Sequence, residues 1–255
     1  MSNLLLEAKQ LSLQQGARLL CKGLNLQVHR QQMWLVLGQN GSGKSTLLSA
    51  LAGWQSTDTG EIRIAGQLLH QLQARQRAKQ LAWMPQHDQH PFPISVLEQV
   101  LTGCHARLSR FAWESQTDHA QAQAWLEQLD LAGFAHQEIA TLSGGEQRRV
   151  ALATALMQQT PLLLLDEPLS QLDLHHQQQT LQLLKRHCQQ GHSVMMVSHD
   201  PNHARHCTHA LLLFGDGRWL AGRVDEVCTA SHLSELYQTT MIELSQDHHR
   251  WFVMV

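Results

Sequence analysis

An eight-residue stretch, "GQNGSGKS" at residues 38–45, constrains the fold of this chain more than any other feature. It fits the pattern G-x-x-x-x-G-K-[ST] at every fixed position, in which glycines let the backbone wrap around phosphate groups. Residues 33–37 before it are continuously apolar, as in a strand buried on both faces, and an apolar helix is expected from about Lys44. In such a loop Lys44 would neutralise the β- and γ-phosphates, and the Ser45 hydroxyl would ligate Mg²⁺. The alternative, a glycine turn without function, does not account for the flanking strand and helix.

Two further apolar runs, in "LLLLDEP" and "SVMMVSHD", end in polar residues and alternate with helical stretches. This alternation predicts an α/β fold with a parallel sheet, in which ligands bind at the carboxyl ends of the strands. Asp166 and Glu167 follow the first run. Asp166 can hold Mg²⁺, usually through water, and Glu167 can act as a general base on an attacking water or orient it. A capped helix start is the alternative interpretation of this acidic pair, and the phosphate loop makes it the weaker one.

Gln86 and His199 follow two other apolar stretches, "AWMP" and "VMMVS". Gln86 precedes a helical region, where its amide could contact both the water shell of a metal and that region. His199 ends a buried strand and could hydrogen-bond a γ-phosphate. The alternatives are an ordinary loop glutamine and a structural histidine.

A second candidate anion site lies in "TLSGGEQRRVALATAL", where Ser143 and Glu146 have the spacing of a capping box at a helix start. Free backbone N–H groups and the positive end of the helix dipole suit such a turn to anions. A well-capped helix alone is the simpler interpretation. However, Gly144 and Gly145 stand in the first turn, and a glycine costs about 1 kcal/mol relative to alanine inside a helix. Two of them indicate that something approaches the backbone closely.

The rest of the chain is organised in three parts. The first third, with "KGLNLQV" and "GEIRIAG", alternates apolar and polar residues as half-buried strands do. The middle third, residues 85–157, has proline breaks at Pro91 and Pro93 and then helical stretches, one of which opens with the capping-box spacing of Ser115 and Asp118. We interpret it as an inserted helical subdomain. The last third returns to alternating strands and helices.

Composition argues against several classes of protein. The chain has 255 residues, 43% of them apolar, and a net charge of −2 without a long basic run, so charge does not indicate nucleic acid binding. Five scattered cysteines without a C-x-x-C pair fit a reducing compartment. The 18 histidines, mostly isolated or in glutamine-rich stretches, are interpreted as solvated surface. No signal peptide is visible, and the apolar runs fall far short of the ~20 residues that span a bilayer. We therefore expect a soluble chain that depends on another chain for any membrane spans.

Together these motifs resemble those of the nucleotide-binding subunits of ABC transporters along nearly the whole chain. "GQNGSGKST" is similar to their Walker A motif, Gln86 to their Q-loop and "LSGGEQRR" to their signature motif. Residues 162–168 resemble Walker B, "SQLD" at 170–173 the D-loop, and His199 the switch histidine, all in the family's order. The resemblance implies a single ABC ATPase domain over residues 1–255. It would have a P-loop NTPase core with a mainly parallel sheet, an N-terminal antiparallel β subdomain, an inserted α-helical subdomain at about 87–157 and a short C-terminal tail at about 222–255.

The resemblance also implies the ligands, ATP and Mg²⁺, and the roles of the site residues. Glu167, His199 and Gln86 would be catalytic, while Ser45, Gln86 and Asp166 would hold the metal. Two such subunits pair head to tail, and each ATP lies between one chain's phosphate loop and the other chain's signature helix, which would explain the two anion sites. The nucleotide would be bound by Gly38, Gln39, Asn40, Gly41, Ser42, Gly43, Lys44, Ser45, Thr46, Ser143, Gly144, Gly145, Glu146 and Asp173.

One departure from the family concerns the adenine ring. The family usually has an aromatic residue, often tyrosine, just before a glycine near the N-terminus, where it stacks on adenine. Here Gln14 and Gln15 stand at that place in "LSLQQGARLL". Stacking is worth about 1–3 kcal/mol per base in single-stranded nucleic acid binding. We therefore expect weaker base selectivity or ATP affinity, with the phosphate chemistry unaffected.

The segment after the Q-loop, with "LSRF" in residues 100–111, and the C-terminal "LSELYQTTMIEL" resemble the ATPases of importers for ferric siderophores, haem and vitamin B12. This implies ATP hydrolysis that powers import of a metal chelate, cobalamin being favoured over haem or a ferric siderophore. The implied partners are a second copy of the chain, a separate transmembrane permease and, indirectly, a substrate-binding protein, at the cytoplasmic face of the membrane and without nucleic acid. The alternatives are an exporter ATPase and a soluble ABC-type ATPase acting on ribosomes or DNA. Proteins of the latter kind usually carry tandem ATPase domains or a long coiled-coil insertion.

Overall fold

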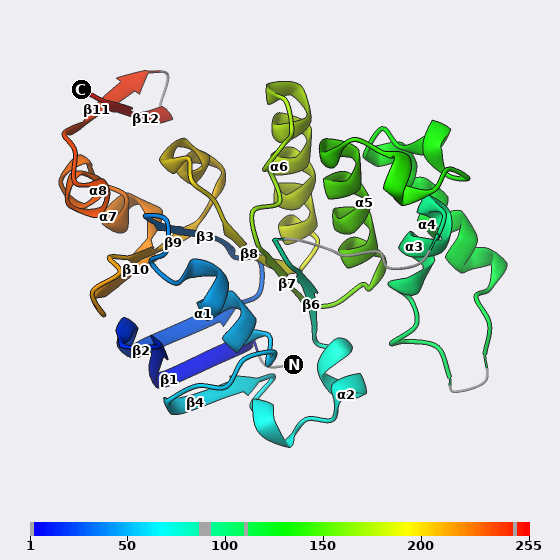
Figure 1. The fold of residues 1–255 in the computed structure, drawn as a ribbon, viewed down its shortest axis with the longest axis horizontal. Helices are drawn as coiled ribbons and strands as arrows, with labels where there is room; N and C mark the ends of the chain where they lie inside the picture. Colours follow the sequence, from blue (N-terminus) through cyan, green and yellow to red (C-terminus); the bar gives the residue numbers. More distant parts are fainter. Residues whose placement is uncertain (1–2, 87–92, 110–111, 247–248) are drawn as a thin grey trace.

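The computed structural model describes residues 3–86, 93–109, 112–246 and 249–255, and Figure 1 shows their arrangement. The central element is a six-stranded sheet in the order β10-β9-β3-β8-β7-β6. Its neighbouring strands are parallel except for β9 and β10, as the alternation of strands and helices predicted. These strands are β3 (Met33–Gly38), β6 (Leu81–Met84), β7 (Leu162–Leu165), β8 (Ser193–Val197), β9 (His209–Leu213) and β10 (Trp219–Arg223).

The N-terminal strands form a separate antiparallel sheet in the order β2-β1-β4-β5. On β2, Leu24, Leu26 and Val28 are buried while Asn25 and Gln27 between them are exposed, which is the alternation seen in the sequence. This sheet therefore has one face on the core and one in solvent. Its strands are β1 (Leu4–Gln15), β2 (Arg18–His29), β4 (Thr59–Ile64) and β5 (Gln67–Leu68).

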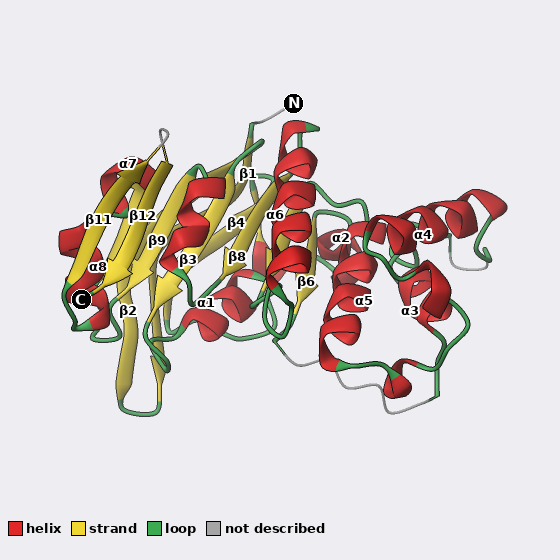
Figure 2. Ribbon diagram, turned by 90° about the horizontal axis from the view of Figure 1, so that it is seen from above, coloured by secondary structure: helices red, strands yellow, loops and turns green. Residues whose placement is uncertain are grey.

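Three helices of the middle third pack on one another, and the third of them also contacts β6 (Figure 2). The capping box of Ser115 and Asp118 is present at the second helix, as its spacing predicted. Residues 87–92, with Pro91, and residues 110–111 of the "LSRF" segment lie outside the described residues, and Pro93 lies in the loop before the first helix. The helices are α3 (Val96–Thr102), α4 (Gln116–Gln128) and α5 (Gly144–Met157), with 3₁₀ turns η2 (Ala132–Phe134) and η3 (Ile139–Thr141) between α4 and α5.

Other helices before the C-terminal tail connect strands of the two sheets. They are α1 (Lys44–Leu51), α2 (Ala74–Ala78) and α6 (Leu174–Gln189), with 3₁₀ turns η1 (Leu69–Gln71) and η4 (Pro201–His206). Within the described ranges, none of the helices is long and apolar enough to cross a membrane.

The C-terminal tail is more structured than the sequence indicated. After α7 (Val224–Val227) and α8 (Ala230–Tyr237), the strands β11 (Met241–Gln246) and β12 (His249–Met254) form a hairpin. Asn202 of η4 anchors this hairpin, because its amide donates to Phe252 O (3.1 Å) and accepts from Phe252 N (2.7 Å). The Arg205 guanidinium lies 4.1 Å from the centre of the Trp251 ring. The tail is thus attached to the turn that begins just after His199.

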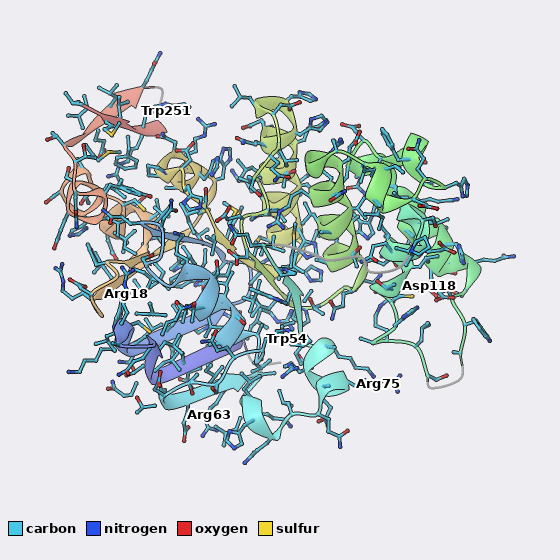
Figure 3. The ribbon with its side chains drawn as sticks, viewed as in Figure 1. Arg18, Trp54, Arg63, Arg75, Asp118 and Trp251 are labelled. Carbon is cyan, nitrogen blue, oxygen red and sulfur yellow. The ribbon has the colours of Figure 1, made fainter. Side chains whose placement is uncertain are left out.

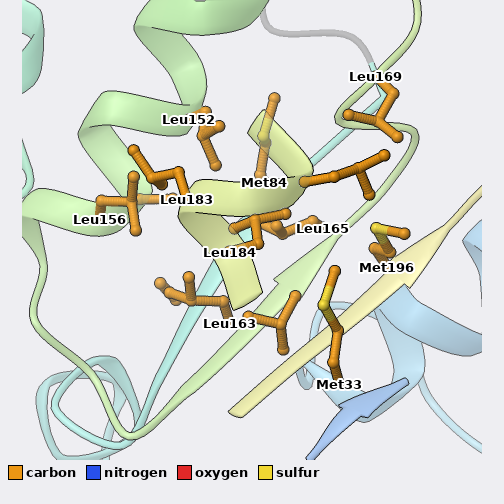
Figure 4. Packing of buried hydrophobic residues seen from close by; sticks show 14 of the residues in the cluster. Met33, Met84, Leu152, Leu156, Leu163, Leu165, Leu169, Leu183, Leu184 and Met196 are labelled. Atoms are coloured by element: carbon orange, nitrogen blue, oxygen red, sulfur yellow. The ribbon is translucent and has the colours of Figure 1, made fainter. Parts of the chain in front are cut away.

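Apolar side chains cover both faces of the six-stranded sheet. Along β3, Leu35 and Leu37 face one side of the sheet, and Trp34 and Val36 face the other, toward α1 and the N-terminal sheet. Burial on both faces explains the continuous apolar runs of these strands. Because the strands are held in this way, the residues that follow their carboxyl ends have fixed starting points. Figure 4 shows part of the first side, where side chains of α5 and α6 meet the sheet: Leu152, Leu156, Leu163, Leu165, Leu183 and Leu184.

Candidate functional site

The phosphate loop connects the end of β3 to the start of α1, as its pattern predicted. Gly41 and Gly43 have φ values of 75° and 97°, in the left-handed region that glycine adopts readily. A Cβ on Gly43 would lie 2.8 Å from the Leu20 Cβ, and one on Gly38 would lie 2.6 Å from Leu213 O. Glycine is therefore required here both by the turn and by the close packing of neighbouring strands.

Lys44 begins α1 and is only 6% exposed. Its Nζ donates to Gly38 O (2.8 Å) and Gln39 O (3.0 Å), so the ammonium group folds back over the loop. Burial lowers the pKa of Lys44, while the nearby carboxylates of Glu167 and Asp166 oppose that shift. The loop thus carries a fixed cation close to two carboxylates from another part of the chain.

Asp166 follows β7 and is 1% exposed. Burial raises the pKa of its carboxyl group, and a hydrogen bond from the Ser45 side chain opposes this. Among the described residues, nothing donates a hydrogen bond to its buried Oδ1. Magnesium prefers hard oxygen ligands, and a carboxylate and a hydroxyl brought together beside a phosphate loop fit it.

Three strand ends converge on the Glu167 carboxylate. Gln86, after β6, donates from Nε2 to Glu167 Oε1 (2.9 Å), and His199 Nε2, after β8, lies 2.7 Å from the same oxygen. A carboxylate oxygen accepts, so the His199 proton in this contact is on Nε2. The sequence named these residues as candidates because each follows an apolar run, and the structure brings their side chains together. Sequence reasoning assigned His199 to a phosphate and Gln86 to a metal's water shell and the helical region, whereas here both side chains contact Glu167.

The backbone of Glu167 is held as firmly as its side chain. Its φ is 54°, in the left-handed region that is uncommon for a residue with a Cβ. Its carbonyl oxygen accepts from Ser170 N (3.1 Å), Ser170 Oγ (3.0 Å) and Arg148 Nε (2.9 Å). Such strain persists only where the surroundings stabilise it, and it concentrates at functional sites.

The second candidate anion site is the first turn of α5, which begins with the predicted capping box. Ser143 Oγ accepts from Glu146 N (3.4 Å), and Glu146 Oε2 accepts from Ser143 N (2.7 Å). A hollow of about 490 Å³ lies beside this turn. None of its described lining residues comes from the phosphate loop at 38–46. The lining includes Ser143, Gly144, Gly145, Gln171, Asp173 and His176.

The structure identifies what approaches the two glycines of this turn. A Cβ on Gly145 would lie 2.7 Å from Gln171 O, and one on Gly144 would collide with Gln171 Oε1. The glycine pair therefore accommodates the D-loop of the same chain.

Two residues proposed from the sequence as nucleotide contacts also serve as helix caps. Glu146 belongs to the capping box of α5, and Asp173 Oδ1 accepts from His176 N (2.8 Å) at the start of α6.

The expected adenine-stacking position contains no aromatic side chain. Gln14 and Gln15 end β1, both are exposed, and Gly16 forms the turn with a φ of 60°. Arg18, which sequence reasoning missed, lies at the start of β2 (Figure 3). Its Nη1 is 3.1 Å from the position of a Cβ on Gly41. A guanidinium group thus borders the phosphate loop, and no local pattern in the sequence marks it.

Comparisons with known proteins agree with this geometry. A protein-family model described as "ABC transporter" matches residues 21–170. The iron(3+)-hydroxamate import ATP-binding protein FhuC of Bacillus subtilis is 34% identical over 91% of this chain and 87% of its own length. The hemin import ATP-binding protein HmuV of Pseudomonas entomophila is 40% identical over 82% of this chain and 83% of its own length.

Solved structures of ABC transporters and their ATP-binding cassettes also align with this chain. A structure described as an inward-facing, metal-chelate type ABC transporter aligns with a TM-score of 0.85 and 30% identity, over 99% of this chain and 98% of that one. A dimeric ATP-binding cassette bound to ADP and phosphate aligns with a TM-score of 0.77 and 26% identity, over 86% of this chain and 98% of that one.

Proposed function

The chain belongs to the ABC transporter family of ATP-binding proteins, which are ATPases coupled to transport, and we propose that it powers the import of an iron chelate through a separate membrane permease. The observation that carries the catalytic part of this proposal is the convergence of Gln86 and His199 on one oxygen of Glu167. Two residues from two strand ends meet at the carboxylate that follows a third strand, and that carboxylate lies near the lysine of a phosphate loop.

In this proposal Glu167 is the general base, or it orients the attacking water. A positioned carboxylate can accept a proton from water as water attacks the γ-phosphate. Gln86 and His199 fix the direction of that carboxylate, and Lys44 supplies positive charge where negative charge develops on the phosphoryl oxygens. The loop residues Gly38, Gln39, Asn40, Gly41, Ser42, Gly43, Ser45 and Thr46 hold the phosphates.

We propose that Ser45 and Asp166 hold Mg²⁺, with Gln86 near its water shell. When bound, the metal would supply positive charge that neutralises the phosphate oxygens. The buried Oδ1 of Asp166, beside the Ser45 hydroxyl, supports this assignment.

We further propose that two copies pair head to tail, so that the turn at Ser143, Gly144 and Gly145 completes the other copy's nucleotide site. Support comes from the hollow beside this turn, whose described lining contains no residue of the chain's own phosphate loop. It also comes from the dimeric form of the cassette that binds ADP and phosphate. Glu146 and Asp173 would act there mainly by fixing their helix starts.

The permease is proposed because the relatives are named as import ATP-binding proteins, and a substrate-binding protein beyond it is proposed from the family resemblance. Within the described ranges, no helix can cross a membrane, so the spans would belong to the permease. We place the chain at the cytoplasmic face of the membrane, with residues 87–157 as the helical subdomain and residues 222–255 as the tail.

The cargo is proposed as a ferric hydroxamate or haem. The relatives are named for iron(3+)-hydroxamate and hemin, and the similar structure is of metal-chelate type. The preference for cobalamin that the sequence suggested has no support from these names, so cobalamin becomes a comparison ligand in the test.

The test is purification of the permease that associates with this chain, followed by reconstitution of the complex in proteoliposomes with a candidate binding protein. ATP-dependent uptake of radiolabelled ferric hydroxamate, haem and cobalamin is measured, with a Lys44→Ala complex as the control for leakage. We expect uptake of an iron chelate only with wild-type chain and ATP. ATP-driven efflux would favour an exporter, uptake of cobalamin alone would reject the iron assignment, and absence of any associated permease would favour a soluble ABC-type ATPase.

A further inference from the structure

Arg148 connects the helix of the signature motif to the strand ends of the catalytic site. It lies in α5, and the residue is 6% exposed. Its Nη1 donates to Pro85 O (2.7 Å) and Gln86 O (3.1 Å), and its Nε donates to Glu167 O (2.9 Å). One guanidinium group therefore joins the backbone after β6 to the backbone after β7.

The position of these carbonyl groups explains why a cation is placed there. Strands β6 and β7 pair through Met84 and Leu165, and Asp166 N then donates to Met84 O (2.9 Å). The carbonyls that Arg148 contacts lie just beyond this last rung, where the strands separate. Arginine suits such a place because its planar group carries five donors in a fixed fork, and hydrogen bonds from a charged donor are stronger than neutral ones.

The same guanidinium holds the backbone of both partners of one side-chain hydrogen bond. Gln86 and Glu167 are linked through Nε2 and Oε1 at 2.9 Å, and each also gives its carbonyl oxygen to Arg148. The left-handed backbone of Glu167 needs such support, since its φ of 54° is unfavourable on its own. Loss of Arg148 would release both residues together.

We propose that Arg148 is a positioning residue for ATP hydrolysis, which sets Gln86 and Glu167 relative to each other and ties both to the helix that begins at the signature glycines. The inference rests on the proposed roles of Gln86 and Glu167. It has a mechanical consequence: a shift of α5 against the sheet moves the carbonyl of Glu167 through this side chain. Hydrolysis thereby depends on where the signature helix lies.

The test uses Arg148→Lys and Arg148→Gln in the full chain. Lysine keeps the charge but lacks the planar fork, and glutamine keeps a donor without the charge. We expect kcat to fall about tenfold or more in both variants, while Kd for ATP stays within about threefold, because the phosphate loop is untouched. The matched control is Arg107→Lys. Arg107 donates from Nη2 to Met157 O (3.1 Å) at the other end of α5, so it holds the same helix without contacting the strand ends.

Thermal unfolding of all three variants separates positioning from general destabilisation. If kcat falls in Arg107→Lys as far as in Arg148→Lys at equal loss of Tm, or if kcat is unchanged in both Arg148 variants, the proposal is wrong.

A double-mutant cycle gives a second readout that structural damage would not mimic. In a Glu167→Gln background, slow hydrolysis of radiolabelled ATP should not fall further when Arg148→Lys is added. A further fall of the same size would overturn the link to Glu167. Failure of the proposed function itself looks different, since the wild-type chain would then show no ATPase.

Discussion

Replacing Glu167 by glutamine is the perturbation that tests the catalytic centre most directly. The substitution keeps the size of the side chain and one oxygen at its end. That oxygen can still accept from Gln86 and His199, which contact Glu167 Oε1 at 2.9 Å and 2.7 Å. The backbone contacts from Ser170 and Arg148 do not involve the side chain at all. What is lost is the ability to take a proton, together with one negative charge near Lys44.

The size of the effect follows from that difference. A positioned general base contributes a factor of about 10²–10⁴ in rate, and this corresponds to about 3–5 kcal/mol in the activation barrier. ATP binding depends on the phosphate loop, whose glycines and Lys44 contacts are unchanged. We therefore expect Glu167→Gln to lose turnover while it keeps ATP affinity, and ATP should then hold two copies together.

The measurements are single-turnover hydrolysis, equilibrium binding of ATP, and light scattering to follow dimerisation. Glu98→Gln is the matched control: it changes an exposed carboxylate of the capping box at the start of α3, where glutamine also caps, and should leave hydrolysis unchanged. Hydrolysis by Glu167→Gln within about threefold of the wild-type rate would remove Glu167 from the role of base.

Lys44→Ala should abolish hydrolysis by removing the cation from the phosphate loop, and near-normal ATPase would refute the assignment of that loop. Mixing Lys44→Ala chains with Ser143→Arg chains should restore single-turnover hydrolysis, because half of the dimers would be mixed and half of their sites intact, about a quarter of all sites. No recovery with mixed dimers shown to form would reject a shared site. Gln15→Tyr, or Gln14→Tyr if the register differs by one, should strengthen ATP binding by about 1–3 kcal/mol in equilibrium binding measurements with ATP and GTP, and no gain in affinity at either position would count against stacking. Burial lowers the pKa of His187 from 6.5 to about 4, so the unfolded chain binds more protons between these values. The free energy of unfolding should therefore fall by up to about 3 kcal/mol as pH drops from about 6.5 to 4, and His187→Leu should flatten that fall in urea titrations.

The parts of the site that follow strands could be predicted from the sequence. A continuous apolar run identifies a strand buried on both faces, and parallel strands bring the residues after their carboxyl ends to one edge. Gln86, Asp166, Glu167 and His199 were found by that rule. The loop at 38–45 was found because its glycines also serve one turn, whose requirements are local to the sequence, besides packing against Leu20 and Leu213.

Other features depend on contacts between distant segments and leave no local signal. Arg148 looks like one more polar residue on a helix, and only the separation of β6 and β7 gives it its partners. Arg18 borders the phosphate loop through the packing of two sheets. The C-terminal hairpin has alternating residues, but its place beside η4 depends on contacts of Asn202 and Arg205 with residues some fifty positions away. Such pairings need tertiary structure before they can be recognised.

The glycine pair at the signature turn shows that a close approach inferred from the sequence can have a cause within the same chain. Two glycines in a first helical turn do indicate a close approach, and the structure contains one. The approaching group is Gln171 of the same chain, itself in the left-handed region with a φ of 62°. A side chain on Gly145 would push against the Gln171 carbonyl and displace the D-loop whether or not a nucleotide binds, whereas one on Gly144 meets only the end of the Gln171 side chain. A Gly145→Ala variant would therefore damage the fold and the proposed anion seat together. Ser143→Arg separates the two more cleanly, because loss of a helix cap costs only about 1 kcal/mol while the added cation enters the hollow itself.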